Sequence, residues 1–257
     1  MSNRTSTHDG VRRIAIDNLG YGSVTIEANA QADVVECSID ADDERLLDEV
    51  KVRPAPTGLR LSFPAESDRG ASTRLRLGVP DGLEYAIKVG SADVTVSAVI
   101  GRSRIITGAG DIHVGEATEL DCSTGSGSIV VGTVVGRAAR LVSGSGNVTL
   151  QAAYCAVSAK SGSGDVTVNS VHHDHVQAKS GSGDIAVNKT SGSVDLRSAS
   201  GSVTVGVADS LPAWLDLDAR TGEIRIGLDP TQQPPPHQPY ISVRARTASG
   251  DITIHRA

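Results

Sequence analysis

The sequence SGSGDVTVN at residues 161–169 returns 19 residues later as SGSGDIAVN at residues 180–188. Each copy is a glycine-rich turn followed by apolar residues at alternate positions. This alternation is typical of a strand that buries one face. Repetition at a fixed spacing indicates an architecture of stacked units, so the repeat decides the fold.

The same phrase can be followed along most of the chain. The first apolar residue after each turn forms the series Val94, Ile112, Ile129, Val148, Val166, Ile185, Val203, Ile224 and Ile252. Seven of the eight steps are 17 to 21 residues long, and the last is 28. A second apolar residue follows two positions later in every copy, and another short strand precedes each turn. No repeat has room for a crossover helix.

Short β units at this spacing predict an all-β fold, a parallel β-solenoid with about 18–19 residues per coil. Equivalent strands of successive coils would pair in parallel about 4.8 Å apart, and the apolar series would form columns inside the coil. The alternative is an antiparallel sandwich with evenly spaced strands. The repeated glycines are expected at corners that need a positive φ, which glycine tolerates.

The regularity of the repeat divides the chain into three regions. Residues 1–10 are polar and are expected to be disordered. Residues 11–82 predict an irregular, partly antiparallel N-terminal cap with one short helix within 42–50. Residues 83–257 hold the solenoid repeats, interrupted by a proline-rich loop at 229–239.

Composition limits the possible partners and location. The net charge of −6, dispersed basic residues and 2 % aromatic content argue against nucleic-acid binding. No segment approaches the ~20 apolar residues of a membrane span, and the first ten residues do not resemble a signal peptide. The three cysteines, Cys37, Cys122 and Cys155, do not suggest a disulfide framework. A cytoplasmic location is therefore expected.

An acidic column precedes the apolar series. Its members are Asp93, Asp111, Ser128, Asn147, Asp165, Asp184, Ser202, Glu223 and Asp251. Aspartate after a glycine corner is ordinary turn chemistry, and this interpretation is preferred. The alternative is a calcium-stabilised repeat, because Gly- and Asp-rich coils bind calcium in other solenoids.

A column of threonines and a histidine-rich segment could suggest binding sites, but a structural role is the preferred interpretation of both. Threonines at 95, 149, 167, 204 and 253 form a column that is broken at four positions, which favours solvent-facing strand residues. The sequence His172-His173-Asp174-His175 is the densest set of potential metal ligands, but it lies in a spacer with no further ligand at a recognisable spacing. It is interpreted as a surface turn.

No enzyme signature emerges. The serines lie at corners without a histidine in constant register, and no glycine phrase has the Gly-Lys-Ser/Thr ending of a phosphate-binding loop. We therefore predict no enzyme and no catalytic, cofactor-binding or metal-binding residues. A carbohydrate-binding or carbohydrate-active β-helix is the main alternative, although Tyr21, Tyr85, Tyr154 and Tyr240 are too dispersed to form a sugar platform.

The chain resembles the bacterial putative-adhesin β-strand-repeat family, whose function is unknown. The matching residues are the strand ending at 79–82 (VPDG), the Ser161–Val168 phrase and the N-terminal GSVTI at 22–26. The resemblance covers roughly residues 11–257 and implies a right-handed, single-stranded β-helix. It implies no catalytic residues.

Together these features predict a non-catalytic scaffold or protein-interaction module. The chain ends directly after a regular strand at 251–255, and no C-terminal cap is recognisable. An end coil would leave unpaired N–H and C=O groups. End-to-end self-association, or capping by a protein partner, is the expected mode of interaction.

Overall fold

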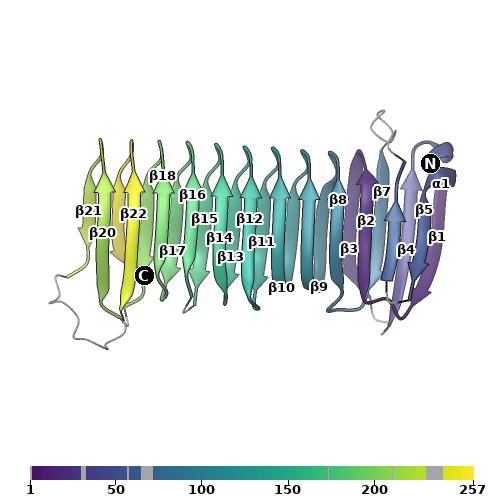
Figure 1. Ribbon diagram of the computed structural model, residues 1–257, viewed down its shortest axis with the longest axis horizontal. Helices are drawn as coiled ribbons and strands as arrows, with labels where there is room; N and C mark the ends of the chain where they lie inside the picture. Colours follow the sequence, from purple (N-terminus) through teal and green to yellow (C-terminus); the bar gives the residue numbers. More distant parts are fainter. Residues whose placement is uncertain are drawn as a thin grey trace. The chain divides into compact units, whose positions relative to one another are not determined.

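The computed structural model describes residues 2–29, 33–56, 58–64, 72–172, 174–209, 211–229 and 240–257. The chain forms two compact units, unit 1 (Met1–Ile129) and unit 2 (Val130–Ala257). Both are built from parallel β-coils, which confirms the predicted all-β solenoid and excludes the sandwich (Figure 1). The fold is a right-handed parallel β-helix.

Unit 1 contains ten strands within the described residues and one helix. They are β1 (Ser2–Asp9), β2 (Arg13–Leu19), β3 (Gly22–Ala28), β4 (Val34–Ala41), α1 (Glu44–Glu49), β5 (Lys51–Ala55), β6 (Gly58–Ser62), β7 (Thr73–Val79), β8 (Glu84–Val89), β9 (Asp93–Thr107) and β10 (Ile112–Thr124).

Parallel coils begin much earlier in the sequence than expected. β2 pairs in parallel with both β6 and β8, and β3 does so with both β7 and β9. The coil formed by β2 and β3 therefore lies between β6/β7 and β8/β9. The irregular cap is confined to the antiparallel partners beyond them, where β4 pairs with β7 and β5 with β6. The predicted helix is present as α1, with Asp43 accepting a hydrogen bond from the Arg45 amide at 3.0 Å.

The N-terminal residues are ordered, contrary to expectation. Ser2–Asp9 forms β1, which pairs antiparallel with β4 along its whole length. The sequence offers no apolar run here because β1 is held mainly through its backbone. Asn3 adds side-chain hydrogen bonds to Ser38 and Asp40 of β4.

Unit 2 contains thirteen strands within the described residues; the first begins at the last residue of unit 1. They are β11 (Ile129–Val134), β12 (Ala138–Ser143), β13 (Val148–Ala153), β14 (Ala156–Ser161), β15 (Val166–Val171), β16 (Val176–Ser180), β17 (Ile185–Thr190), β18 (Val194–Ser198), β19 (Val203–Val207), β20 (Ala213–Ala219), β21 (Ile224–Gly227), β22 (Ile241–Thr247) and β23 (Ile252–Arg256).

The strand register confirms the apolar columns. Val148 lies opposite Val166, Val166 opposite Ile185, and Ile185 opposite Val203, so successive coils are 18 or 19 residues long. All four side chains are almost completely buried. The sequence period therefore translates directly into a stacked aliphatic core.

The coils at the end of unit 2 do not follow chain order. β22 pairs with β18 on one side and β20 on the other, and β23 lies between β19 and β21 (Figure 1). The C-terminal strand is therefore internal, and residues 213–227 form the outermost coil. The sequence analysis was wrong to place the open edge at 251–255. The proline-rich loop falls largely on residues 230–239, which lie outside the described part of the chain.

Most of the repeated glycines are required for a different reason from the one predicted. Positive φ values occur, among the described glycines, at residues 10, 22, 82 and 250; of the repeated corners, only the last one, Gly250 before Asp251, is in this group. At the corners, successive backbones stack closely. A Cβ on Gly164 would lie 2.4 Å from the Gly146 carbonyl oxygen, and one on Gly183 would lie 2.2 Å from that of Gly164. A side chain would force the coils apart.

We expect Gly164→Val to lower the free energy of unfolding by about 3 kcal/mol or more, because the contact is with backbone that cannot rotate away. Thr167→Val, on the outward side of β15 in the same coil, should change it by less than ~0.5 kcal/mol. Chemical denaturation of both variants measures the difference. Equal effects would refute the close-stacking explanation.

Candidate functional site

A ladder of buried hydroxyls crosses the corners of the coils. Its members are Thr107, Thr124, Ser143, Ser161, Ser180, Ser198 and Thr247. The Ser161 hydroxyl donates to the Gly146 carbonyl of the preceding coil and accepts from the Gly164 amide of its own corner, both at 2.9 Å. Ser180 repeats this with Gly164 and Gly183 at 3.0 and 2.9 Å. These hydroxyls satisfy backbone groups, so they are not free nucleophiles.

The sequence analysis missed this ladder, although it placed the serines at corners. The signal is present in the sequence: in seven turns a Ser or Thr lies three residues before the glycine that ends the turn, as Ser161 does before Gly164. Only the stacked structure shows that the same hydroxyl also reaches the neighbouring coil.

The acidic column forms a second ladder beside the hydroxyls. Asp165 accepts from the Asp184 amide of the next coil at 2.8 Å, and Asp184 accepts from the Ser202 amide at 2.8 Å. Asn147 occupies the same position and accepts from the Asp165 amide at 2.9 Å. An amide oxygen thus replaces a carboxylate oxygen, which supports the turn interpretation over a calcium site.

The hydrogen bonds of the acidic column follow the spatial order of the coils and not their order in the sequence. The Asp251 amide donates to the Ser202 hydroxyl, and Asp251 in turn accepts from the Glu223 amide at 3.0 Å. No cluster of three or more potential metal ligands occurs among the described side chains.

The histidine-rich spacer does not assemble into a single site in the described structure. His172 stacks on Tyr154 with ring centroids 4.5 Å apart and an interplanar angle of 5°. Asp174 accepts from the His175 amide at 2.7 Å, as expected for a turn. His173 lies outside the described residues.

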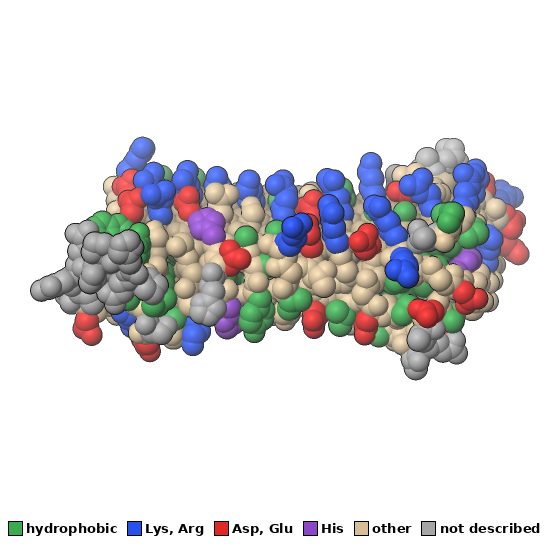
Figure 2. All heavy atoms as spheres, turned by 60° about the horizontal axis from the view of Figure 1, so that its bottom comes forward, with side chains coloured by type: hydrophobic (Ala, Val, Ile, Leu, Met, Phe, Trp, Pro, Cys, Tyr) green, Lys and Arg blue, Asp and Glu red, His purple; other side chains and the backbone are tan. Residues whose placement is uncertain are grey.

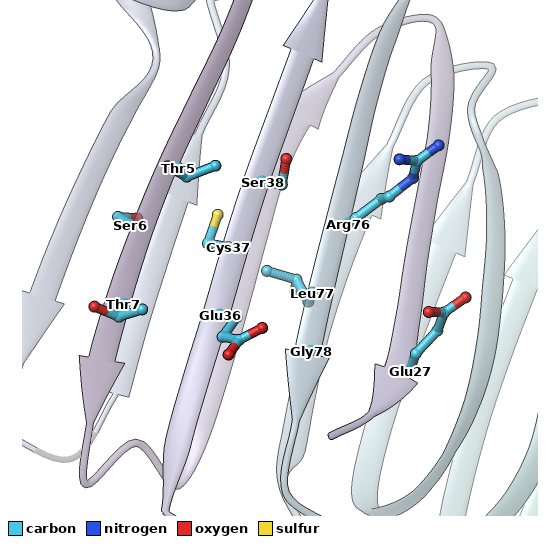
Figure 3. Close-up of a pocket in the computed structure, with 10 residues that line it drawn as sticks. All are labelled: Thr5, Ser6, Thr7, Glu27, Glu36, Cys37, Ser38, Arg76, Leu77 and Gly78. Carbon is cyan, nitrogen blue, oxygen red and sulfur yellow. The ribbon is translucent and has the colours of Figure 1, made fainter. Parts of the chain in front are cut away.

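A hollow of about 480 Å³ in unit 1 is lined by β1, β3, β4 and β7 (Figure 3). Cys37 lies in its wall, and Arg76 and Glu27 project from other strands without converging on the thiol. Burial raises the pKa of Cys37 to about 11, although a hydrogen bond with Ser6 opposes this shift. The thiol is therefore protonated at neutral pH and is a poor nucleophile.

The other two cysteines are equally inert. Burial raises the pKa of Cys155 to about 11, with Asp174 adding to the shift, and raises the pKa of Cys122 even further. All three are free thiols. None combines exposure with the lowered pKa that a reactive cysteine needs.

A second hollow in unit 1, of about 520 Å³, carries positive charge. Arg13, Arg53 and Arg60 line it together with small apolar residues. Arg60 also contacts Asp17 at 3.5 Å. The described lining residues of this hollow therefore contribute positive charge and apolar surface.

The outermost coil of unit 2 leaves its core uncovered. Ile224 belongs to the same column as Val203 and Ile252, which have no exposed surface, yet its side chain is 42 % exposed. Ile226 is 51 % exposed for the same reason. Leu215 and Leu217, which lie opposite Val243 and Ala245, are only half-buried. These four residues, Leu215, Leu217, Ile224 and Ile226, are called here the open end.

The strands that carry the open end are paired on one side. β20 pairs with β22 and β21 with β23, and no other partner occurs within the described residues. Their free edges present backbone donors and acceptors beside an uncovered apolar core. Unpaired backbone groups of this kind are a template for another strand. Within the described chain, no helix is long and apolar enough to cross a membrane.

These features define a parallel β-solenoid whose outermost described coil in unit 2 is paired on one side. A family model, Toastrack DUF4097, matches residues 23–255, and the chain belongs to this family. The match confirms the resemblance to a β-strand-repeat family of unknown function. A comparison with curated proteins finds no match.

Several solved bacterial structures are similar across nearly the whole chain. A "putative adhesin" from Bacteroides fragilis has 13 % identity and a TM-score of 0.46, covering 98 % of this chain and 97 % of that one. Another from Parabacteroides merdae has 12 % identity and a TM-score of 0.46, covering 98 % and 95 %. A "putative lipid binding protein" from Parabacteroides distasonis has 15 % identity and a TM-score of 0.47, covering 99 % and 96 %.

The two ladders should respond differently to mutation. Ser161→Ala leaves a buried amide and a buried carbonyl without their partner, and should cost about 2 kcal/mol of unfolding free energy. Asp165→Asn keeps the acceptor, as Asn147 does, and should change it by less than ~0.5 kcal/mol. Calcium should not raise the melting temperature of either the parent protein or the variants. A calcium-dependent rise that Asp165→Asn abolishes would instead support a metal site.

The cysteines should be unreactive in the folded protein. A thiol reagent at pH 8 is expected to label none of the three, because their raised pKa values and burial leave almost no accessible thiolate. In denaturant all three should react. Rapid labelling of Cys37 alone in the native protein would show that the hollow admits the reagent and that the thiol is ionised.

Proposed function

We propose that this protein is a non-catalytic β-solenoid module that binds protein, and that its open end binds a second copy of the chain. The observation that carries the proposal is the exposure of Ile224 and Ile226 in a column that is otherwise fully buried. An edge with both free backbone groups and apolar side chains gains more from pairing than a polar edge does.

The outer strands of unit 1 are less suitable partners for this edge. β1 is polar along its length, and β5 carries Lys51, Arg53 and Pro54. Charges and proline protect edges, because proline lacks the N–H that a ladder needs. A head-to-tail chain of copies is therefore disfavoured. The better partner is the same open end of another copy, related by a two-fold axis, which gives a closed dimer.

The absence of catalysis is part of the same proposal. The hydroxyls and carboxylates of the coils are engaged with backbone groups, and the thiols are protonated. A cytoplasmic location remains a prediction from the sequence; three buried free thiols are compatible with it.

Sedimentation velocity over a hundredfold range of concentration should show a monomer that converts to a dimer and no further. Ile226→Lys should abolish the dimer, because it would place a charge in the apolar contact. The matched control is Val135→Lys, which changes another exposed apolar residue of unit 2, with 44 % exposure, away from the open end. Growth into longer oligomers would contradict the two-fold arrangement. A monomer at every concentration would contradict self-association.

A further inference from the structure

A row of positive charge runs across the strands of unit 2, separate from the open end. The register places Lys160 opposite Lys179, Lys179 opposite Arg197, and Arg197 opposite Arg246. These four residues are called here the cationic ladder. Their positions are about 4.8 Å apart, the spacing of paired strands. Figure 2 shows Lys and Arg side chains along the upper edge of this part of the molecule.

Strands β9 and β10 of unit 1 arrange their charges differently. There, opposite charges face each other: Arg102 lies opposite Glu119, with 3.7 Å between Nε and Oε1, and Arg104 lies opposite Asp121, with 3.5 Å between Nε and Oδ2. Like charges directly opposite each other on neighbouring strands are destabilising. The four-cation row of unit 2 therefore carries a cost that the alternating charges of β9 and β10 avoid.

The charge of the ladder is only partly compensated. Arg197 contacts Asp195 on its own strand at 3.1 Å, and Arg246 contacts Asp216 at 3.5 Å. Lys160 and Lys179 have no ion-pair partner among the described residues. An external anion can supply the missing negative charge. Since the cations are evenly spaced along the stacking direction, the best-matched anion is a linear polymer with regularly spaced charges.

The neighbouring side chains narrow the class of polymer. Ser158 and Gln177 lie two residues before Lys160 and Lys179, on the same side of β14 and β16, and lie opposite each other; Asp195, which pairs with Arg197, continues this row on β18. Ser158 and Gln177 are uncharged hydrogen-bonding groups suited to hydroxyls. β14, β16 and β18 carry no aromatic residue on which bases could stack. Duplex DNA has a charge every ~1.7 Å along its axis, far denser than the ladder. In an extended peptide, side chains on one face are about 6.7 Å apart, so acidic side chains of a peptide would not stay aligned with cations about 4.8 Å apart.

We propose that the cationic ladder binds a linear acidic polysaccharide, with one carboxylate per sugar, laid along the stacking direction of the coils. The carboxylates face the cations and the sugar hydroxyls face Ser158 and Gln177. Lys160 and Lys179 lie on β14 and β16, away from the strands of the open end, so an isolated monomer would bind as well.

The test uses the full-length chain and a fluorescently labelled polygalacturonate oligosaccharide, with anisotropy as the readout. Binding should disappear when the same oligosaccharide is fully methyl-esterified, which removes its charge and keeps its backbone. Lys160→Gln/Lys179→Gln should weaken binding at least tenfold at low salt. By analogy with single-stranded polyanions, the slope of log K against log salt should fall from about −3 to about −1.5.

The matched control is Lys88→Gln/Lys189→Gln, which removes the same charge from lysines outside the ladder and should weaken binding less than twofold. Absence of binding to polygalacturonate would overturn the proposal, and so would an equal loss in both double variants. Tighter binding to polyglutamate or to a single-stranded DNA oligonucleotide of matched charge would also overturn it, in favour of a protein or nucleic-acid ligand.

Discussion

The close stacking of backbone at the corners is the constraint on which the rest of the structure depends. Successive corners approach so closely that a Cβ would overlap the carbonyl below, as at Gly164 above Gly146. At Gly164 and Gly183 glycine is therefore required by contact between coils and not by a positive φ, whereas Gly250 combines such a contact with a φ of +155°. The same approach brings the Ser161 hydroxyl and the Asp165 carboxylate within reach of the adjacent coils. The buried apolar columns, the glycine corners and the two polar ladders all follow from the same spacing between stacked coils.

The polar residues of the corners are used in this way all along the stack. Once the coils stack, their oxygens satisfy backbone groups that would otherwise be buried without a partner. Two kinds of surface stay accessible in unit 2: the edge of its outermost described coil and the outward side chains of the strands.

The order of the coils decides which edge is free. In unit 2 the chain passes outward to β20 and β21 and then returns to insert β22 and β23 beneath them. In unit 1 the coil of β2 and β3 is likewise paired on both sides. The exposed position in unit 2 therefore falls to Ile224 and Ile226 of the outermost described coil.

The sequence by itself determined the repeat, the inward columns and the predominance of β-structure, because period-2 alternation and an 18- or 19-residue step are local properties. It also marked the acidic column, whose side chains accept from backbone amides of the next coil. Only the tertiary structure decided the coil order at the end of unit 2, since Ile224 and Ile252 carry the same local signal and differ only in their neighbours. It also decided the pairing of Ser2–Asp9 with β4, the second partner of each corner hydroxyl and the alignment of four cations. Each of these depends on which strands lie side by side, and a single repeat does not encode that.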